Sequence, residues 1–138
     1  VMETNFLSHA IVTKIFLPIL KRQKKLADII FIGSESSISG GRYGSIYCAS
    51  KFAVRGFAQS LREECAKTSI RVSIVNPGAV RTHFFDGLNF EPGSSPDNAI
   101  NPEDVAEVLL TILEARPGTV IDEVNLSPQT KVWNRKSS

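Results

Sequence analysis

A tyrosine and a lysine lie four residues apart in a segment with helical periodicity. Tyr47 and Lys51 would share one face of a helix, one turn apart. An ammonium group beside a phenol stabilises the phenolate and lowers the pKa of the phenol from its ordinary value of about 10. A tyrosine placed in this way can exchange a proton near neutral pH. The spacing alone is a weak signal, because Tyr-x-x-x-Lys also arises by chance.

Two predicted strands end beside polar or turn-forming residues. The continuous apolar run at residues 29–32 is typical of a central parallel strand, and Ser34 follows it directly. Residues 71–76 predict a second strand, which stops at Pro77 and Gly78. Parallel strands end at the same edge of a sheet, where open α/β sheets bind ligands. We therefore expect the Ser34 hydroxyl to hydrogen-bond a substrate oxygen and hold it against Tyr47.

Three helices are predicted to position these residues. Apolar residues recur at three- and four-residue steps over residues 4–23, which predicts a helix buried on more than one side. A second helix is expected over residues 45–67, with Ser45 as its N-cap. A third is expected over residues 102–115, with Asn101 as its N-cap and proline at the first position.

The order of elements predicts the fold class. The alternation of apolar and polar residues over residues 119–126 predicts a third strand, so helices and strands follow one another throughout the chain. This alternation predicts an α/β fold with a parallel sheet and right-handed crossovers. The connection over residues 82–101 is long for a compact domain and suggests a functional lid or a disordered loop. We expect the tail at residues 131–136, which includes Trp133, to be a partly ordered terminus.

Composition excludes several classes of protein. The chain has 138 residues, of which 42% are hydrophobic, enough for one modest core. The net charge of +2 is too small for a nucleic-acid-binding surface. Residues 10–20 form the longest apolar stretch, which is too short to span a membrane. Cys48 and Cys65 form no Cys-x-x-Cys motif, which favours a reducing cytoplasm, and His9 and His83 lack metal-ligand spacing, so no metal site is predicted.

The candidate residues together resemble a known family. The sequence Tyr-Cys-Ala-Ser-Lys at residues 47–51 resembles the Tyr-x-Ala-Ser-Lys motif of the short-chain dehydrogenase/reductase family. Ser34 lies 13 residues before the tyrosine, as the family's serine does. Residues 76–82 are similar to the family's Asn-Pro-Gly-x-x-x-Thr segment, and Asn5 lies where the family carries a helix asparagine. The resemblance implies a Rossmann-like parallel sheet with flanking helices.

The resemblance also implies catalytic roles for four residues. Tyr47 would be the acid/base that exchanges a proton with the substrate hydroxyl or carbonyl. Lys51 would lower the pKa of that tyrosine and bind the nicotinamide ribose. Ser34 would polarise the carbonyl, and Asn5 would hold a water that links Lys51 to solvent.

A nicotinamide cofactor, NAD or NADP, is implied in the same way. The backbone of Val80 and the side chain of Thr82 would bind the carboxamide, while Pro77 and Gly78 would shape the turn beneath it, and Tyr47 and Lys51 would complete the cofactor site. The partner would be a small-molecule alcohol or carbonyl, with no nucleic acid or membrane involved. The family commonly self-associates through two long helices, which implies a homo-oligomer, either a dimer or a tetramer.

One family feature does not occur in this sequence. Residues 1–138 contain no glycine-rich strand-turn-helix for the cofactor pyrophosphate, and the spacing of Gly40, Gly41 and Gly44 fits no dinucleotide fingerprint. The resemblance covers the family's fifth, sixth and seventh strands. We therefore expect residues 1–138 to be the C-terminal portion of a single NAD(P)-binding Rossmann-type domain, without its glycine-rich N-terminal half.

Three interpretations remain open from the sequence. The first is an NAD(P)-dependent oxidoreductase that transfers a hydride between nicotinamide and an alcohol or carbonyl. The second is a truncated, non-catalytic module that keeps the site residues but cannot bind dinucleotide by itself. The third is that a companion piece completes the sheet. Glu35, next to Ser34, could contact substrate or could face solvent, and the substrate itself is left undetermined.

Overall fold

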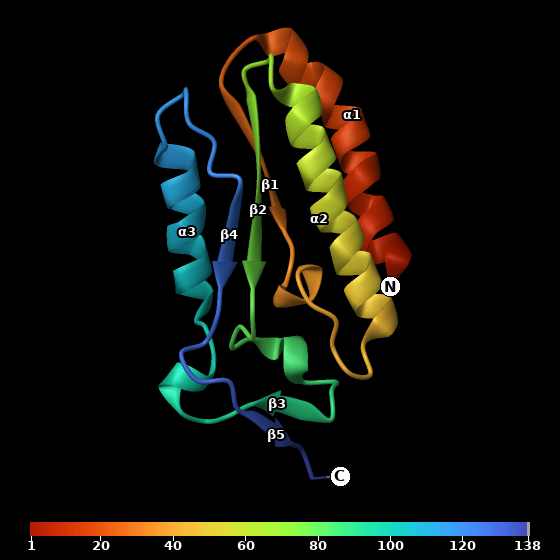
Figure 1. Ribbon diagram of the computed structural model, residues 1–138, viewed down its shortest axis with the longest axis vertical. Helices are drawn as coiled ribbons and strands as arrows, with labels where there is room; N and C mark the ends of the chain where they lie inside the picture. Colours follow the sequence, from red (N-terminus) through yellow and green to blue (C-terminus); the bar gives the residue numbers. More distant parts are fainter. Residues whose placement is uncertain (138) are drawn as a thin grey trace.

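The main sheet of the computed structural model, which describes residues 1–137, has three parallel strands in the order β1-β2-β4 (Figure 1). Its strands are β1 (Ala27–Ile32), β2 (Ile70–Pro77) and β4 (Glu123–Leu126). The helices between and around them are α1 (Ser8–Gln23), α2 (Ser45–Cys65) and α3 (Pro102–Glu114). This arrangement confirms the predicted α/β fold with a parallel sheet.

Strand β2 is buried along its whole length because helices cover both faces of the sheet. Successive side chains of a strand point to opposite faces. Ile70, Val72 and Ile74 belong to a core cluster with residues of α2, and α1 packs against this cluster. The neighbouring Arg71 instead reaches the C-terminal end of α3. In Figure 1, α1 and α2 accordingly lie together on one side of the strands and α3 lies on the other.

The ends of three elements differ from the expected boundaries. The first helix begins with a π-helical turn over Glu3–Leu7 (η1) before α1. Gly44, and not Ser45, is the N-cap of α2, because the Gly44 carbonyl already accepts a hydrogen bond from the Cys48 N–H at 2.8 Å. Strand β4 begins only at Glu123, and the Asp122 carbonyl just before it accepts hydrogen bonds from both the Ile74 N–H and the Arg62 side chain.

The expected N-cap of α3 is confirmed. The Asn101 N–H donates to the Asp104 carboxylate at 2.8 Å, and the Asp104 N–H donates to the Asn101 carbonyl at 3.1 Å. Pro102 occupies the first helical position, where its missing N–H costs nothing. Within residues 1–137, no helix combines the length and hydrophobicity that a membrane span requires.

A second, smaller sheet lies beyond the C-terminal edge of the main sheet (Figure 1). Strand β3 (Phe90–Pro92) pairs antiparallel with β5 (Trp133–Arg135). The expectation of a partly ordered terminus is therefore wrong for residues 133–135. The reason is tertiary: Trp133 packs on Phe85 and Phe90, and the Lys136 N–H donates to the Asn89 carbonyl at 2.9 Å.

Candidate active site

A cavity of about 930 Å³ lies at the edge of the sheet where β1 and β2 end. Loops that follow these two strands, the start of α2 and the β3–β5 sheet form its walls. Its lining includes all but one of the residues singled out from the sequence: Ser34, Tyr47, Lys51, Pro77, Gly78, Val80 and Thr82. The tertiary structure thus brings these separate segments to one site.

Tyr47 and Lys51 lie in the first two turns of α2. The Lys51 Nζ lies 5.9 Å from the centroid of the Tyr47 ring, so the ammonium is close to the phenol. The same Nζ donates a hydrogen bond to the Ile32 carbonyl at 3.3 Å, at the end of β1. Burial lowers the pKa of Lys51 from its ordinary value, because the charged ammonium is partly removed from water.

Ser34 follows β1 and is the N-cap of a short 3-10 helix, η2 (Glu35–Ser37). Its Oγ accepts a hydrogen bond from the Ser36 N–H at 3.1 Å, and its own N–H donates to the Ser37 Oγ at 3.0 Å. These two bonds fix the position of the side chain. The hydroxyl hydrogen is left to donate to a molecule in the cavity.

Close packing beneath Ser34 explains why glycine precedes it. A Cβ on Gly33 would lie 2.1 Å from the Asn76 Oδ1 and 2.8 Å from the Ser37 Oγ. Asn76 is itself fixed, since its Nδ2 donates to the Glu123 Oε1 at 2.9 Å. Only a residue without a side chain fits between β1 and Asn76 at this point.

Val80, in the segment after β2, lines the cavity, and its carbonyl accepts a long hydrogen bond from the Thr82 Oγ1 at 3.5 Å. Val80 forms a parallel bridge with Ile100, in which the flanking Arg81 N–H and Ala79 carbonyl make the hydrogen bonds. The N–H and carbonyl of Val80 itself therefore point away from Ile100. A donor and an acceptor side by side on a cavity-lining residue match the two functional groups of a primary carboxamide, so these residues fit the nicotinamide cofactor that the family implies.

Asn5 is the one candidate that does not line the cavity in the part of the chain that the structure describes. It lies in the π-helical turn η1, and its Nδ2 donates to the Ser50 Oγ at 3.1 Å. The Ser50 Oγ in turn donates to the Tyr47 carbonyl at 2.7 Å. Asn5 therefore contacts the turn that carries Tyr47 and Lys51 through Ser50, a fully buried link that the sequence reasoning had not assigned.

The tertiary structure settles the place of Glu35 and brings aromatic residues to the same site. Glu35, left open between substrate contact and solvent, lines the cavity and forms an ion pair with Lys131. The aromatic residues Phe84, Phe85, Phe90 and Trp133 form one wall of the same cavity. Phe84, Phe85 and Phe90 lie within the long 82–101 connection, which the sequence marked as a functional lid or a disordered loop, whereas no sequence pattern indicated Trp133.

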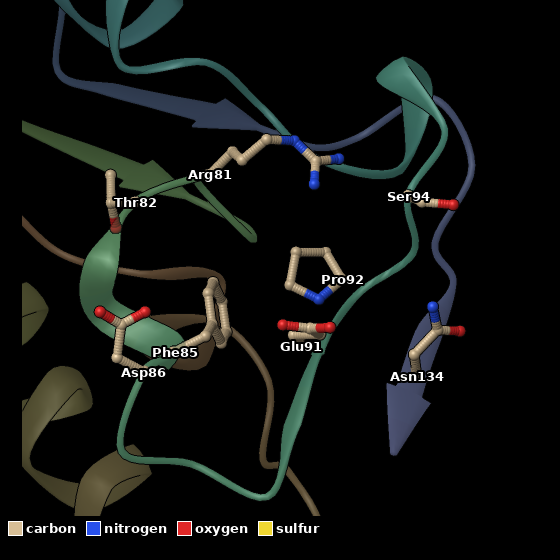
Figure 2. A pocket seen from close by; sticks show the side chains of 8 residues that line it. All are labelled: Arg81, Thr82, Phe85, Asp86, Glu91, Pro92, Ser94 and Asn134. Carbon is tan, nitrogen blue, oxygen red and sulfur yellow. The ribbon is translucent and has the colours of Figure 1, made fainter. Parts of the chain in front are cut away.

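A smaller pocket of about 190 Å³ lies next to the cavity and shares only Thr82 and Phe85 with it. Figure 2 shows the charged side chains of Arg81, Asp86 and Glu91 around this pocket. The Arg81 guanidinium donates to backbone carbonyls of residues 93 and 95 at 3.0 and 3.1 Å. Charged side chains thus make up a larger share of the lining of the small pocket, three of eight residues, than of the large cavity, three of 22.

Comparison with known proteins indicates the same family as the sequence motifs. The family model for short chain dehydrogenases matches residues 1–92. The NADP-dependent 3-hydroxy acid dehydrogenase of Schizosaccharomyces pombe is 35% identical over 133 residues, which cover 92% of this chain and 51% of that protein. The sepiapterin reductase of Chlorobaculum tepidum is 31% identical, with coverage of 92% and 50%. The chain spans about half the length of the curated relatives it matches.

Solved structures share the fold over the same extent. The alcohol dehydrogenase from the archaeon Thermococcus sibiricus, complexed with 5-hydroxy-NADP, has a TM-score of 0.80 at 25% identity and matches 95% of this chain and 53% of its own. The closed form of serine dehydrogenase complexed with NADP⁺ has a TM-score of 0.78 at 27% identity, with coverage of 91% and 53%. With the family model matching 92 of the 138 residues, the chain belongs to the short-chain dehydrogenase/reductase family.

Proposed function

We propose that this chain carries the proton-transfer site of an NAD(P)-dependent oxidoreductase that interconverts an alcohol and a carbonyl compound. The observation that carries the proposal is the convergence of Ser34, Tyr47 and Lys51 on one cavity. Each comes from the family motif, and each has the chemical character that the reaction needs. The family membership supports oxidoreductase chemistry in general, and the roles of the single residues are the proposal.

In the direction of carbonyl reduction, Tyr47 donates its phenolic proton to the carbonyl oxygen as that oxygen becomes a hydroxyl. Ser34 donates a hydrogen bond to the same oxygen and stabilises the negative charge that develops on it. Lys51 stabilises the phenolate that remains, because its ammonium lies 5.9 Å from the ring centroid. In the oxidation direction Tyr47 removes the proton from the alcohol.

The cofactor site proposed here lies beside the same groups. A bound nicotinamide would supply or accept the hydride. The Val80 N–H and carbonyl together with the Thr82 hydroxyl would bind the carboxamide, and Lys51 would also bind the ribose. Relatives support a nicotinamide cofactor without deciding between its two forms, since solved neighbours are described as complexes with NADP⁺ and with NADH.

Asn5 is proposed to take part in proton transfer by holding a water next to Lys51. Its position supports this role, because its side chain bonds to Ser50, which directly precedes Lys51. An Asn5→Ala variant should then slow turnover without a matching rise in KM. An unchanged kcat in this variant would contradict the role.

The assignment of residues 1–138 to the C-terminal portion of one Rossmann-type domain is part of the proposal. It is supported by the coverage of about half of each relative and by the position of β1 at the edge of the described sheet. The reading frame upstream of the Val1 codon tests it. A stop codon immediately upstream would contradict it.

Self-association through α1 and α2 is proposed from the apolar side chains that these helices leave exposed. They include Ile11, Ile15 and Phe16 on α1 and Phe52 on α2. An exposed apolar surface of this kind marks an interaction site. Sedimentation equilibrium should show a dimer or larger species, and a strictly monomeric chain at micromolar concentration would contradict this proposal.

Exchange of Tyr47 for phenylalanine tests the central role. Oxidation of NADPH or NADH is followed at 340 nm against a panel of carbonyl compounds. Loss of the proton donor should lower kcat/KM by about 10²–10⁴-fold while the chain keeps its stability. The matched control is Tyr43→Phe, the other tyrosine of the chain, which also lines the cavity but is 98% exposed and lies outside the Tyr-x-x-x-Lys pair. A Tyr47→Phe variant with the parental rate would contradict the proposal.

The second candidate is a non-catalytic module that retains the site but does not bind dinucleotide. It is favoured by the lack of a glycine-rich strand-turn-helix in residues 1–138. Calorimetric titration of the 138-residue chain with NADH and NADPH separates the two candidates. Binding in the micromolar range contradicts the module, and absence of binding agrees with a chain that cannot bind dinucleotide by itself.

A further inference from the structure

A row of aromatic rings extends from the proposed acid/base along one side of the cavity. The Tyr47 ring lies 6.4 Å from Phe84, and Phe84 lies 5.1 Å from Phe85, measured between ring centroids. The row continues from Phe85 to Trp133 at 5.9 Å and from Trp133 to Phe90 at 5.4 Å. We call Phe84, Phe85, Phe90 and Trp133 the aromatic wall.

Much of the aromatic wall is not covered by protein. Phe84 is 59% exposed, Phe90 is 40% exposed and Trp133 is 46% exposed, although all three line the cavity. Only Phe85 is buried, and it forms the base on which the other rings pack. Contiguous exposed apolar surface inside a cavity is typical of a ligand site.

Hydrogen bonds hold the aromatic wall in place. The antiparallel pair β3–β5 sets Pro92 opposite Trp133 and Phe90 opposite Arg135. The Thr82 Oγ1 accepts a hydrogen bond from the Phe84 N–H at 3.2 Å. The Lys136 Nζ donates to the Phe85 carbonyl at 2.5 Å. The wall is therefore a formed surface and not a set of freely moving side chains.

The charged side chains around the cavity already have partners or roles. Glu35 pairs with Lys131, and the Arg42 guanidinium lies 5.7 Å above the Tyr43 ring. Lys51 belongs to the proposed chemistry. Arg81, Asp86 and Glu91 line the small pocket and not the large cavity (Figure 2). The large cavity consequently offers a carbonyl-binding end at Tyr47 and Ser34 and an apolar surface beyond it.

We infer that the aromatic wall binds the apolar body of a bulky alcohol or carbonyl substrate, such as a fused-ring or long-chain ketone. The inference rests on the proposed function for the reacting end of the substrate. A volume of about 930 Å³ is at the upper end of the usual range for ligand cavities, about 300–1,000 Å³, and leaves room for such a body beside a nicotinamide ring. A small hydroxy acid would leave the wall uncovered.

Trp133 provides a direct test because it is the single tryptophan of the chain and lies in the wall. Its fluorescence is titrated with 2-decalone, a fused-ring aliphatic ketone, and with 3-hydroxybutyrate, each with and without NADP⁺. We expect a saturable change with 2-decalone and none with 3-hydroxybutyrate at equal concentration. Phe90→Ser and Phe84→Ser should each weaken 2-decalone binding by about tenfold, since each removes a large apolar contact. Leu110→Ser is the matched control, at a 56% exposed position on α3 outside the cavity.

The outcomes separate this inference from the proposed function. Saturable 2-decalone binding without any NAD(P)H oxidation at 340 nm upholds the substrate class and counts against the oxidoreductase. Equal binding of both probes, or no binding of 2-decalone, overturns the substrate class. Unchanged affinity in both serine variants, with circular dichroism showing that they fold, overturns it as well. Tyr47-dependent turnover confined to 3-hydroxybutyrate overturns the substrate class and leaves the oxidoreductase standing.

Discussion

Arg71 and Lys51 are two cations at opposite ends of the parallel strands, and their surroundings differ sharply. Arg71, near the start of β2, is only 5% exposed and makes a bidentate pair with Asp28, at 2.7 and 2.9 Å. Its guanidinium also donates to five carbonyls at the end of α3 and just beyond it, at 2.7–3.4 Å. Lys51, where β1 ends, donates to the Ile32 carbonyl at 3.3 Å and has no carboxylate partner within residues 1–137.

The pKa shifts of these two side chains have opposite signs. Hydrogen bonds from Arg71 to Asp28 raise the pKa of the guanidinium, so folding stabilises its charged form. Burial lowers the pKa of Lys51, so folding disfavours its charged form. A cation whose donors are all satisfied stabilises the fold, whereas one held with few partners is available to a ligand or a reacting group. Arg71 thus has a structural role at the amino end of the sheet, whereas the proposed chemistry lies at the carboxyl end.

Removal of Arg71 should give the largest loss of stability. Arg71→Met leaves Asp28 buried without its partner and frees the carbonyls at the end of α3, so we expect a loss of about 3–5 kcal/mol in the free energy of unfolding. Urea denaturation measures this change. Arg62→Met is a suitable comparison, because Arg62 donates to two carbonyls and its ion-pair partner is exposed; we expect about 1–2 kcal/mol there. If the two variants were equally stable, the structural assignment of Arg71 would be wrong.

A side chain at residue 33 should disturb the packing at the other end of the strands, where β1 ends and Ser34 follows. Gly33→Ala forces the new methyl group against Asn76 and Ser37, and we expect a loss of about 1–3 kcal/mol in unfolding free energy together with lower turnover, because Ser34 must move. Gly56→Ala is the control: no atom lies within 4 Å of its added Cβ, and alanine favours the helix by about 0.5–1 kcal/mol. An unaltered kcat in Gly33→Ala would show that the position of Ser34 does not depend on this packing.

Replacement of Lys51 should have the smallest effect on the free energy of unfolding, and this effect should be a gain, whereas the two variants above lose stability. Because folding lowers the pKa of Lys51 below its ordinary 10.5, the unfolded chain binds more protons between the lowered value and 10.5. The destabilising contribution is complete below the lowered pKa and disappears as the pH rises toward 10.5. Lys51→Met should therefore be more stable than the parent by up to about 1 kcal/mol at neutral pH, a figure reduced for solvent screening.

Urea denaturation at several pH values between 7 and 10 measures the Lys51 effect. The stability difference between Lys51→Met and the parent should shrink as the pH rises, and Lys67→Met, at an exposed position, is the matched control. A Lys51→Met variant that is less stable at every pH would remove the contrast with Arg71.

The sequence predicted those parts of the site that depend on local spacing or on the direction of strands. Tyr47 and Lys51 are one helical turn apart, so any helix there brings them together. Ser34 and Pro77 meet because parallel strands end at one edge. The aromatic wall could be predicted only in part: Phe84, Phe85 and Phe90 lie in the 82–101 connection, but β3 and β5 have three residues each and no periodicity reveals that they pair. The N-cap of α2 was also misplaced, because Ser45 and Gly44 are both compatible with that position and only the hydrogen bonds decide.

By itself, the sequence determined the α/β alternation, the family and which residues we propose for proton transfer, because periodicity and short motifs act over a few residues. Only the tertiary structure decided that Arg71 binds Asp28 and the end of α3, that Lys131 neutralises Glu35, and that Trp133 faces the cavity. These contacts join residues far apart in the chain, and their formation depends on packing and burial, which no local pattern encodes.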